Sequence, residues 1–535
     1  MNKLSFIRLL LAVSLAGCGK APPAVETGDR EKILHVGNGA EPRDLDPQIV
    51  NAMTDSWLCQ TLFENLVAPD PQTGDPKPAA AVRWEISDDG LTYIFHLRPE
   101  SKWSNGDPVT AEDFRWSYQR ILTPALAAEY SYMLWVVKNA EAYNKGELKD
   151  FKQVGFSVIE PLTLRVDLAR PTPYFLSLIA HQSWSPVHRP TIEKYGTMAQ
   201  RGTAWTRAGN LVGNGPFTLA DWRPNEVLTV KKSPYYWDAA HVKLNEIRFY
   251  PIENAATEER AFRGGQLHVS YGLPTEKTPV YKRDHRDSLR LEPWPEIDYI
   301  RVNVTRKPLD DVKVRLALGR AIDRRGIVES IRKRGERPAH CYTPPHPGYV
   351  ARANLPTDFE AARKSLAEAG YPGGKGFPKL EVLFPTSKGG GEIVEAIQAT
   401  WKKELNIDVT VRNEEFKVYL DSQRKLQYDL TMSIWIGDYP DPNTFLDMML
   451  TGNGNNDTGW GNPDYDRLIT QANLTLDRAK RFELFQQAEE LLINEAPVLP
   501  IFFGAHVYLA RPEVKGYVVA PGGIIAYKNV ELVTP

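Results

Sequence analysis

The strongest constraint on the fold is the length of chain that follows a single N-terminal apolar run. Roughly 500 residues remain after that run, which is more than one hydrophobic core normally supports, so two or three domains are expected. From Ile33 onward, short strand-like segments alternate with helical segments, and no repeat of fixed period is visible. Strands that alternate with helices of ordinary length favour α/β domains.

Several elements can be placed along the chain from local patterns. Residues 91–97 alternate as a strand does, and the Asn-Gly pair at 105–106 predicts a tight turn. Thr110 and Asp113 have the spacing of a capping box, which predicts that a helix begins there. Further helices are predicted at 312–322, 358–369, 392–404 and 477–494, and further strands at 380–384, 408–411 and 430–436.

The N-terminal apolar run has the features of a lipoprotein signal peptide. Lys3 and Arg8 flank a run at 9–16 that is shorter than the roughly 20 residues of a spanning helix, and small residues lead to Cys18. We therefore expect a signal peptide and lipobox over residues 1–18, with Cys18 acylated so that two or more chains anchor the protein in a membrane. Residues 19–32 mix Gly, Pro, Ala and charges without apolar periodicity, which predicts a flexible tether.

Composition and motifs argue against several classes of function. The net charge is −2 and no basic stripe is present, so nucleic acid is not an expected partner. The chain has no H-E-x-x-H, G-x-S-x-G, Walker A or paired C-x-x-C motif, so no enzyme activity and no cofactor are predicted. Asn453, Asn455 and Asp457 alternate as in a calcium loop, but Thr458 replaces the required glycine. A solvated loop is favoured over a metal site.

Two cysteines remain once Cys18 is set aside. Cys59 and Cys341 are some 280 residues apart in a chain predicted to be exported, where thiols can oxidise. The sequence leaves both possibilities open: a disulfide, which needs Cα atoms within about 7 Å, or two buried thiols.

Five segments, taken together, resemble the peptide/opine/nickel family of ABC-transporter solute-binding proteins, and among them the oligopeptide-binding branch. The segments are EPRDLDP at 41–47, LFENL at 62–66, WSNGDPVTAEDF at 103–114, NGPF at 214–217 and YTPP at 342–345. They occur in order, and the resemblance runs from about Ile33 to the C-terminus.

The resemblance implies an α/β, two-lobed periplasmic-binding-protein fold of type 2, with three domains and a hinge between the lobes. The implied division assigns 33–63, 191–295 and 507–535 to lobe 1, 64–190 to an inserted domain of that lobe, and 296–506 to lobe 2.

The resemblance also implies the function. A member of this family is expected to bind an oligopeptide in the cleft between its lobes and to deliver it to the permease subunits of an ABC importer. The peptide lies extended and pairs with backbone at strand edges, so that affinity depends little on its sequence. The expected protein is a monomer in the periplasm or at the cell surface, held by the lipid on Cys18. The alternative is a receptor for a modified or cell-wall-derived peptide or another amine-bearing solute.

The segment from Trp435 to Pro442 resembles the family's amine-binding segment. Asp438 falls at the aspartate that meets the peptide's α-ammonium, a charge that needs a carboxylate once it leaves water. Taken alone, an aspartate before Pro-rich sequence is also typical of a turn. By the same correspondence, Ile434, Trp435 and Ile436 offer backbone to the ligand. Phe416, Tyr271 and Trp435 line pockets, although Phe416 and Tyr271 are equally compatible with ordinary core packing.

The sequence departs from the family at the other end of the ligand. Met432 and Gln423 stand where the best-known oligopeptide binders have arginines that meet the ligand carboxylate, and the family's histidine is absent from 387–391. Arg424 lies beside Gln423, and Arg332 falls near a family lysine that reaches longer ligands. The remaining candidates for a carboxylate partner are therefore Arg424, Arg332 and Lys388.

Overall fold

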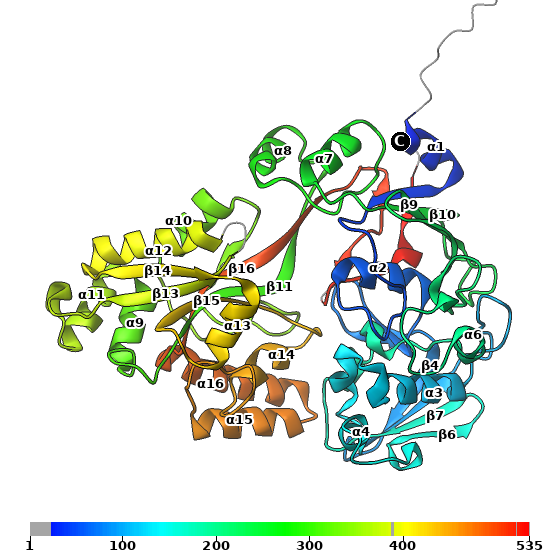
Figure 1. Cartoon of the computed structure of the whole chain (residues 1–535), viewed down its shortest axis with the longest axis horizontal. Coiled ribbons are helices and arrows are strands. Elements are labelled where there is room, and N and C mark those ends of the chain that lie inside the picture. The colour runs from blue at the N-terminus through cyan, green and yellow to red at the C-terminus, as the bar shows by residue number, and fades with distance from the viewer. Residues whose placement is uncertain (1–22, 387–389, 521, 534–535) are drawn as a thin grey trace, which may run out of the picture.

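The computed structural model describes residues 23–386, 390–520 and 522–533. The predictions made for the signal peptide, Cys18 and Lys388 lie outside these residues. The described chain forms two lobes, and two long strands, β11 (Leu289–Val302) and β16 (Val498–Leu509), run between them (Figure 1).

The first lobe contains a four-stranded sheet with the order β1-β10-β9-β8. Its strands are β1 (Ile33–Gly37), β10 (Glu246–Tyr250), β9 (Val227–Lys232) and β8 (Phe217–Arg223), and β1 runs parallel to β10. The core against this sheet joins residues 34–63 and 187–269 to residues 508–532. The two ends of the described chain therefore pack into the same core.

A second sheet lies in the part of the first lobe built from residues after 64. Its order is β4-β5-β7-β6, with β4 (Ala81–Ile86), β5 (Thr92–Leu97), β7 (Thr163–Asp167) and β6 (Phe156–Glu160). Helix α3 (Ala111–Leu122) packs on it and begins with the predicted capping box, in which Thr110 and Asp113 bond each other's backbone N–H. The core of this part contains buried residues from Leu66 to Trp184.

The second lobe contains a six-stranded sheet of order β12-β16-β11-β15-β13-β14. Besides β11 and β16, its strands are β12 (Arg337–Pro338), β13 (Leu380–Pro385), β14 (Val409–Glu414) and β15 (Leu430–Ile436). Its helices include α9 (Val312–Arg320), α11 (Phe359–Glu368), α12 (Gly390–Leu405), α13 (Phe416–Arg424), α15 (Pro463–Leu474) and α16 (Arg478–Glu495). The helices and strands predicted from residue 312 onward are thereby confirmed, with ends that differ by at most three residues.

The two long strands connect the lobes at their middle. Leu289 of β11 and Leu509 of β16 pack beside Phe262 of the first lobe, whereas Ile297 and Val302 belong to the core of the second. The β11–β16 register breaks between Pro293 and Ile297. The break falls where the paired strands leave one core and enter the other, which is the expected place for a hinge.

The remaining elements are short and connect these layers. They are α2 (Met53–Leu62), β2 (Val67–Pro69), β3 (Pro76–Pro78), α4 (Ala140–Asn144), α5 (Phe175–Leu178), α6 (Arg189–Tyr195), α7 (Ala255–Arg263), α8 (Thr278–Asp284), α10 (Arg324–Gly326), α14 (Asn443–Leu446), β17 (Val514–Lys515), β18 (Val519–Ala520), β19 (Ile524–Ile525) and β20 (Glu531–Leu532).

The prediction of a flexible tether over residues 19–32 is wrong for its second half. Residues from Ala24 to Glu31 form helix α1. Val25 is buried and its N–H donates to the Gly265 carbonyl at 3.1 Å, and Asp29 lies 3.3 Å from the His268 ring nitrogen. Composition predicts disorder because the segment has little apolar surface of its own to bury. The helix is nevertheless stabilised by the buried side chain of Val25 and by its contacts with Gly265 and His268.

Both cysteines in the described chain are free thiols. Cys59 is buried in the core of the first lobe, and Cys341 packs beside the core of the second. No helix among the described residues is long and apolar enough to cross a bilayer. The described residues also contain no group of three or more His, Cys, Asp or Glu side chains arranged to hold a metal ion.

Candidate ligand-binding site

Strand β15 carries an open edge. One side of β15 pairs with β11 over its whole length, from Val302–Leu430 to Glu296–Ile436. On the other side, β13 pairs only with Leu430 and Thr431. Within the described residues no strand pairs with this side of β15 from Met432 to Ile436, so part of the strand has unused backbone donors and acceptors.

The backbone groups on the open edge can be assigned from the ladder. The Gly437 N–H donates to the Pro295 carbonyl at 2.8 Å, toward β11. Backbone groups of successive residues alternate in direction along a strand, so Ile434 and Ile436 direct their N–H and C=O groups away from β11. The Met432 carbonyl also points away from β11, where it accepts from the Tyr419 hydroxyl. Ile434 and Ile436 therefore present the groups to which an added strand would bind.

Asp438 stands just past the end of this edge. Its backbone N–H donates to Thr444 Oγ1 at 3.1 Å, and its Oδ2 accepts from the Tyr132 hydroxyl of the first lobe at 3.4 Å. Burial raises the pKa of Asp438 to about 6, and the bond from Tyr132 opposes this only in part. The described residues supply no cation to this carboxylate, so its ionised form is short of partners.

A cavity between the lobes surrounds Asp438. This interlobe cavity has a volume of about 580 Å³. Tyr132, Arg170 and Tyr174 line it from the first lobe, and Trp435 and Asp438 line it from the second. Tyr174 and Tyr439 stack across the gap with ring centroids 5.0 Å apart. Asp438 thus faces a space that both lobes enclose.

A second cavity wraps around the open edge of β15. This edge cavity also has a volume of about 580 Å³, and Trp435 and Asn455 line both cavities. Of the residues predicted for the site, four more line the edge cavity: Phe416, Arg424, Arg332 and Ile434. The structure therefore gathers most of the predicted residues along one edge, from Asp438 to Arg332.

Tyr271 lies away from this edge. Its ring packs against Trp57 in the first lobe at a centroid distance of 5.3 Å, and its N–H donates to Glu258 Oε1 at 2.8 Å. It does not line the interlobe or the edge cavity as the described residues form them. These contacts agree with ordinary core packing, the second of the two roles that the sequence left open for Tyr271.

The positions that depart from the family also lie in the edge cavity. Gln423 is buried, and its amide donates to Tyr419 Oη at 2.6 Å and Ser433 Oγ at 2.9 Å. Met432 lines the same cavity with an apolar side chain. The Arg332 Nε bonds Glu336 Oε1 at 3.1 Å, while Arg424 is exposed and makes no ion pair with the described residues.

Sequence reasoning missed three charged residues of the edge cavity. Glu296, Asp298 and Arg301 all come from β11, which the sequence did not predict as a strand. Arg301 is buried and pairs with Asp457 Oδ2 at 2.9 Å. A Glu-x-Asp-x-x-Arg pattern that leads into an apolar run was visible, but the prolines at 293 and 295 argued against a central strand.

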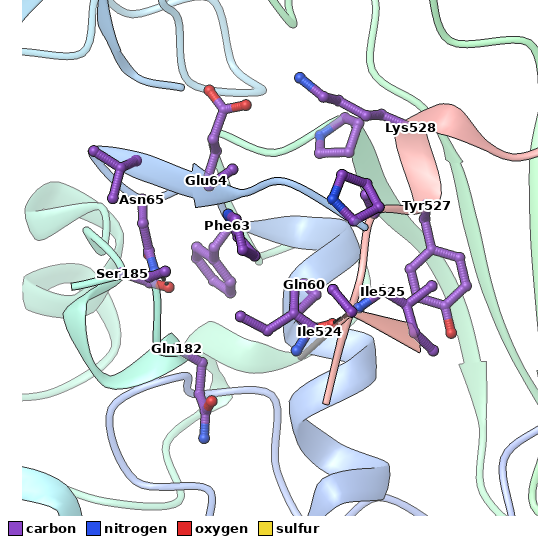
Figure 2. Close-up of a pocket in the computed structure, with 18 of the residues that line it drawn as sticks. Gln60, Phe63, Glu64, Asn65, Gln182, Ser185, Ile524, Ile525, Tyr527 and Lys528 are labelled. Carbon is purple, nitrogen blue, oxygen red and sulfur yellow. Dashed lines mark hydrogen bonds between the residues drawn. The ribbon is translucent and has the colours of Figure 1, made fainter. Parts of the chain in front are cut away.

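A further cavity in the first lobe is too small for a ligand of this kind. Figure 2 shows Glu64 and Lys528 at its upper rim and Phe63, Gln60 and Ile524 inside. Its volume is about 90 Å³, against about 580 Å³ for each of the other two cavities. The Glu64 carboxylate already accepts from Trp237 Nε1 at 2.7 Å and from the Tyr236 hydroxyl.

Comparison with known proteins gives a consistent result. Residues 75–457 match the family described as bacterial extracellular solute-binding proteins, family 5 Middle. The oligopeptide-binding protein OppA of Bacillus subtilis is 34% identical over 98% of this chain and 97% of its own length.

Solved structures agree over the same length. The unliganded open form of MppA, a periplasmic murein tripeptide binding protein, matches with a TM-score of 0.85 at 30% identity, covering 94% of this chain and 98% of its own. Haemophilus influenzae OppA in complex with the peptide RPPGFSPFR matches with a TM-score of 0.72 at 31% identity, covering 94% and 99%.

Proposed function

Because the chain belongs to the family 5 bacterial extracellular solute-binding proteins, whose members are transport receptors, we propose that it binds oligopeptides between its lobes and delivers them to an ABC importer. One observation carries the proposal: within the described residues, an unpaired strand edge ends at a half-buried carboxylate that has no cation beside it. The edge supplies backbone pairing that is independent of peptide sequence, and Asp438 supplies the partner for an α-ammonium group. The protein itself catalyses no reaction in this scheme.

The edge fixes the direction of the bound peptide. An ammonium group at Asp438 lies beyond the C-terminal end of β15, so the peptide must run back toward Met432. It therefore adds antiparallel to β15 and exchanges hydrogen bonds with Ile434 and Ile436. Trp435, Phe416, Arg424 and Arg332 then border the side chains and the far end of the ligand, whereas Tyr271 supports the first lobe from outside both cavities.

The test is a comparison of free and N-acetylated tripeptides by calorimetry. Acetylation removes the ammonium charge and should cost about 3 to 5 kcal/mol, the usual cost of breaking a buried ion pair from one side. Asp438→Asn should cost about the same for free peptides, which is roughly two to four decades in Kd. The variant should fold, because it removes a charge that burial disfavours. Equal affinities for free and acetylated peptides would contradict the assignment of Asp438.

A second candidate ligand is a cell-wall-derived peptide. It is favoured by the similarity to MppA, whose structure is that of a murein tripeptide binding protein. Native mass spectrometry of protein purified without refolding would separate the candidates, because a retained ligand reports its own mass.

Membrane attachment through Cys18 is part of the proposal and is supported by the sequence of the N-terminal segment. Cys18→Ser should move the protein from the membrane fraction to the soluble fraction of the periplasm or medium. Unchanged recovery with membranes would count against the lipobox. The division into lobe and inserted domain proposed above is supported by the three separate cores.

A further inference from the structure

Two carboxyl groups share one face of the sheet with the open edge of β15. Glu296 and Asp298 lie on β11 directly opposite Ile436 and Ile434 on β15. Directly opposite residues of an antiparallel pair project to the same face, and so do residues two apart on one strand. The two acids and the two isoleucines therefore occupy one face, and Glu296, Asp298 and Ile434 all line the edge cavity.

Asp298 is buried within hydrogen-bonding reach of Glu296, and its carboxyl group is only partly satisfied by the described residues. Its side chain faces the edge cavity, the residue is 3% exposed, and Oδ2 has no hydrogen-bond partner among the described residues. Burial raises the pKa of Asp298 well above its usual range, and the neighbouring Glu296 carboxylate raises it further against the field of Arg332. Burial likewise raises the pKa of Glu296. An unpartnered acceptor of this kind is costly to bury, and a donor from a ligand would relieve that cost.

Acidic groups outnumber basic groups around the acid pair within the described residues. Arg332, Arg334 and Glu336 face it from the segment after α10, and Glu336 is itself bonded by Arg332 Nε at 3.1 Å and by the Arg334 N–H at 2.9 Å. On the opposite face of the sheet, Arg301 is matched by Asp457. Among the described residues, three carboxyl groups thus face two guanidinium groups. The raised pKa values of Glu296 and Asp298 favour a proton on the acid pair in the unliganded protein, and a ligand cation can displace that proton.

We propose that Glu296 and Asp298 form a subsite for the cationic side chain of a lysine or arginine residue in the bound peptide. This inference rests on the proposed function, because the peptide strand on β15 is what brings the side chain to the subsite. A ligand residue opposite Ile434 or Ile436 directs its side chain to the face that carries the acid pair.

The distance across the sheet selects a long side chain. Neighbouring strands are about 4.8 Å apart, so a peptide strand paired with β15 lies roughly 10 Å from β11. Ile434 and Ile436, which are 53% and 44% exposed, cover the space between. The methylenes of lysine or arginine can lie on these isoleucines while the charged head reaches the acids, which a short cationic side chain cannot do.

The test is a positional scan by calorimetry on the purified protein. The ligands are trialanine and trialanine in which each position in turn carries lysine, the neutral isostere norleucine, or 2,3-diaminopropionic acid, whose ammonium is attached to Cβ. At a position that faces the acid pair, lysine should bind about 10-fold to 100-fold more tightly than norleucine, the range expected for hydrogen bonds to a charged group. Diaminopropionic acid should show no such gain.

Isosteric variants test whether the tighter binding of lysine peptides depends on Glu296 and Asp298. Asp298→Asn and Glu296→Gln should remove the preference for lysine over norleucine, measured as the ratio of the two affinities within each variant. Glu292→Gln is the matched control, because Glu292 is a half-buried acid on the same strand that lies outside the edge cavity and bonds Tyr508 and Val519. It should keep the preference. Lysine peptides should also release protons on binding, measured in buffers of different ionisation enthalpy, whereas norleucine peptides should not.

The outcomes separate this subsite from the proposed function. If trialanine binds but lysine never exceeds norleucine at any position, the subsite is wrong and the peptide site stands. If the double variant Asp298→Asn with Glu296→Gln still binds lysine peptides more tightly than norleucine peptides, the subsite is also wrong. If no peptide binds, the proposed function fails and the subsite fails with it.

Discussion

At the scale of single residues, Asp438 has the properties of a group held ready for a cation. Among the described residues, its one polar contact from the first lobe is the hydroxyl of Tyr132 at 3.4 Å, and burial raises its pKa to about 6. The unliganded protein therefore takes up a proton at Asp438 as the pH falls through about 6, and a bound ammonium group must displace it.

This pKa predicts how the affinity for alanine peptides depends on pH. Above pH 6 the carboxylate is ionised before the ligand arrives, so affinity should be constant up to the pH at which the peptide amine loses its proton. Below pH 6 the affinity should fall about tenfold per pH unit, because each unit lowers the ionised fraction tenfold. Calorimetry between pH 4.5 and 7.5 measures this, and Asp438→Asn should abolish the dependence. An unchanged wild-type affinity at pH 4.5 would refute it.

The residues at the far end of the ligand predict a weak requirement for a free carboxylate. The Gln423 amide already donates hydrogen bonds to Tyr419 and Ser433. Met432 is apolar, and the Arg301 guanidinium is paired with Asp457, so none of the three side chains offers a free cation to a ligand carboxylate. Amidating the C-terminus of a tripeptide should therefore cost less than about 1 kcal/mol. Titration of matched acid and amide peptides checks this. A penalty above about 2 kcal/mol would reveal a charge-assisted contact with the carboxylate, and repeating the titration with Arg424→Gln would show whether Arg424 makes it.

At the scale of elements, β15 is a strand with one paired and one open side. Replacing Ile434 with proline removes an N–H that faces the open side and leaves the ladder to β11 intact. We expect Ile434→Pro to lower peptide affinity by about 1 to 2 kcal/mol beyond Ile434→Ala, with a comparable Tm for the two variants. Trp435→Pro is the control, since the Trp435 N–H faces β11 and its loss should lower Tm. Equal affinities of Ile434→Pro and Ile434→Ala would argue against strand addition.

Elements that carry their own local signals were predictable, and β11 was not. The capping box at Thr110 and Asp113 and the apolar periods of the helices after residue 312 are properties of short windows. Strand β11 contains Pro293 and Pro295, which normally mark the end of a strand. The two prolines are tolerated because the β11–β16 register breaks between Pro293 and Ile297. No local sequence pattern reveals this break, because the partner strand lies about 200 residues away along the chain.

At the scale of the whole molecule, the two lobes are joined through β11 and β16 (Figure 1). The interlobe cavity is lined by residues of both lobes. The arrangement superposes better on an unliganded open relative than on a relative that holds a peptide. Rotation about the register break near Pro293 would bring the first lobe toward the edge of β15.

We therefore expect a saturating free peptide to lower the radius of gyration measured by small-angle X-ray scattering. Binding should also stabilise the folded protein by about 2.7 kcal/mol at a free ligand concentration of 100 Kd, seen as a rise in Tm. The N-acetylated peptide at the same concentration is the control and should change neither quantity. A radius of gyration that stays constant at saturation would show that binding does not close the lobes.

The sequence by itself determined the α/β class, the positions of α3, α9, α11, α12 and α16, and the family, because propensity, capping and ordered motifs are local and additive along the chain. It also pointed to Asp438, through a motif at the end of a recognisable strand. The tertiary structure alone decided that the half-buried Asp438 has no cation beside it among the described residues, that Ile434 and Ile436 face an open edge, and that Tyr271 lies elsewhere. It alone placed Glu296 and Asp298 beside that edge. These facts depend on which distant segments pair and which remain unpaired, and pairing between strands is a property of the folded chain.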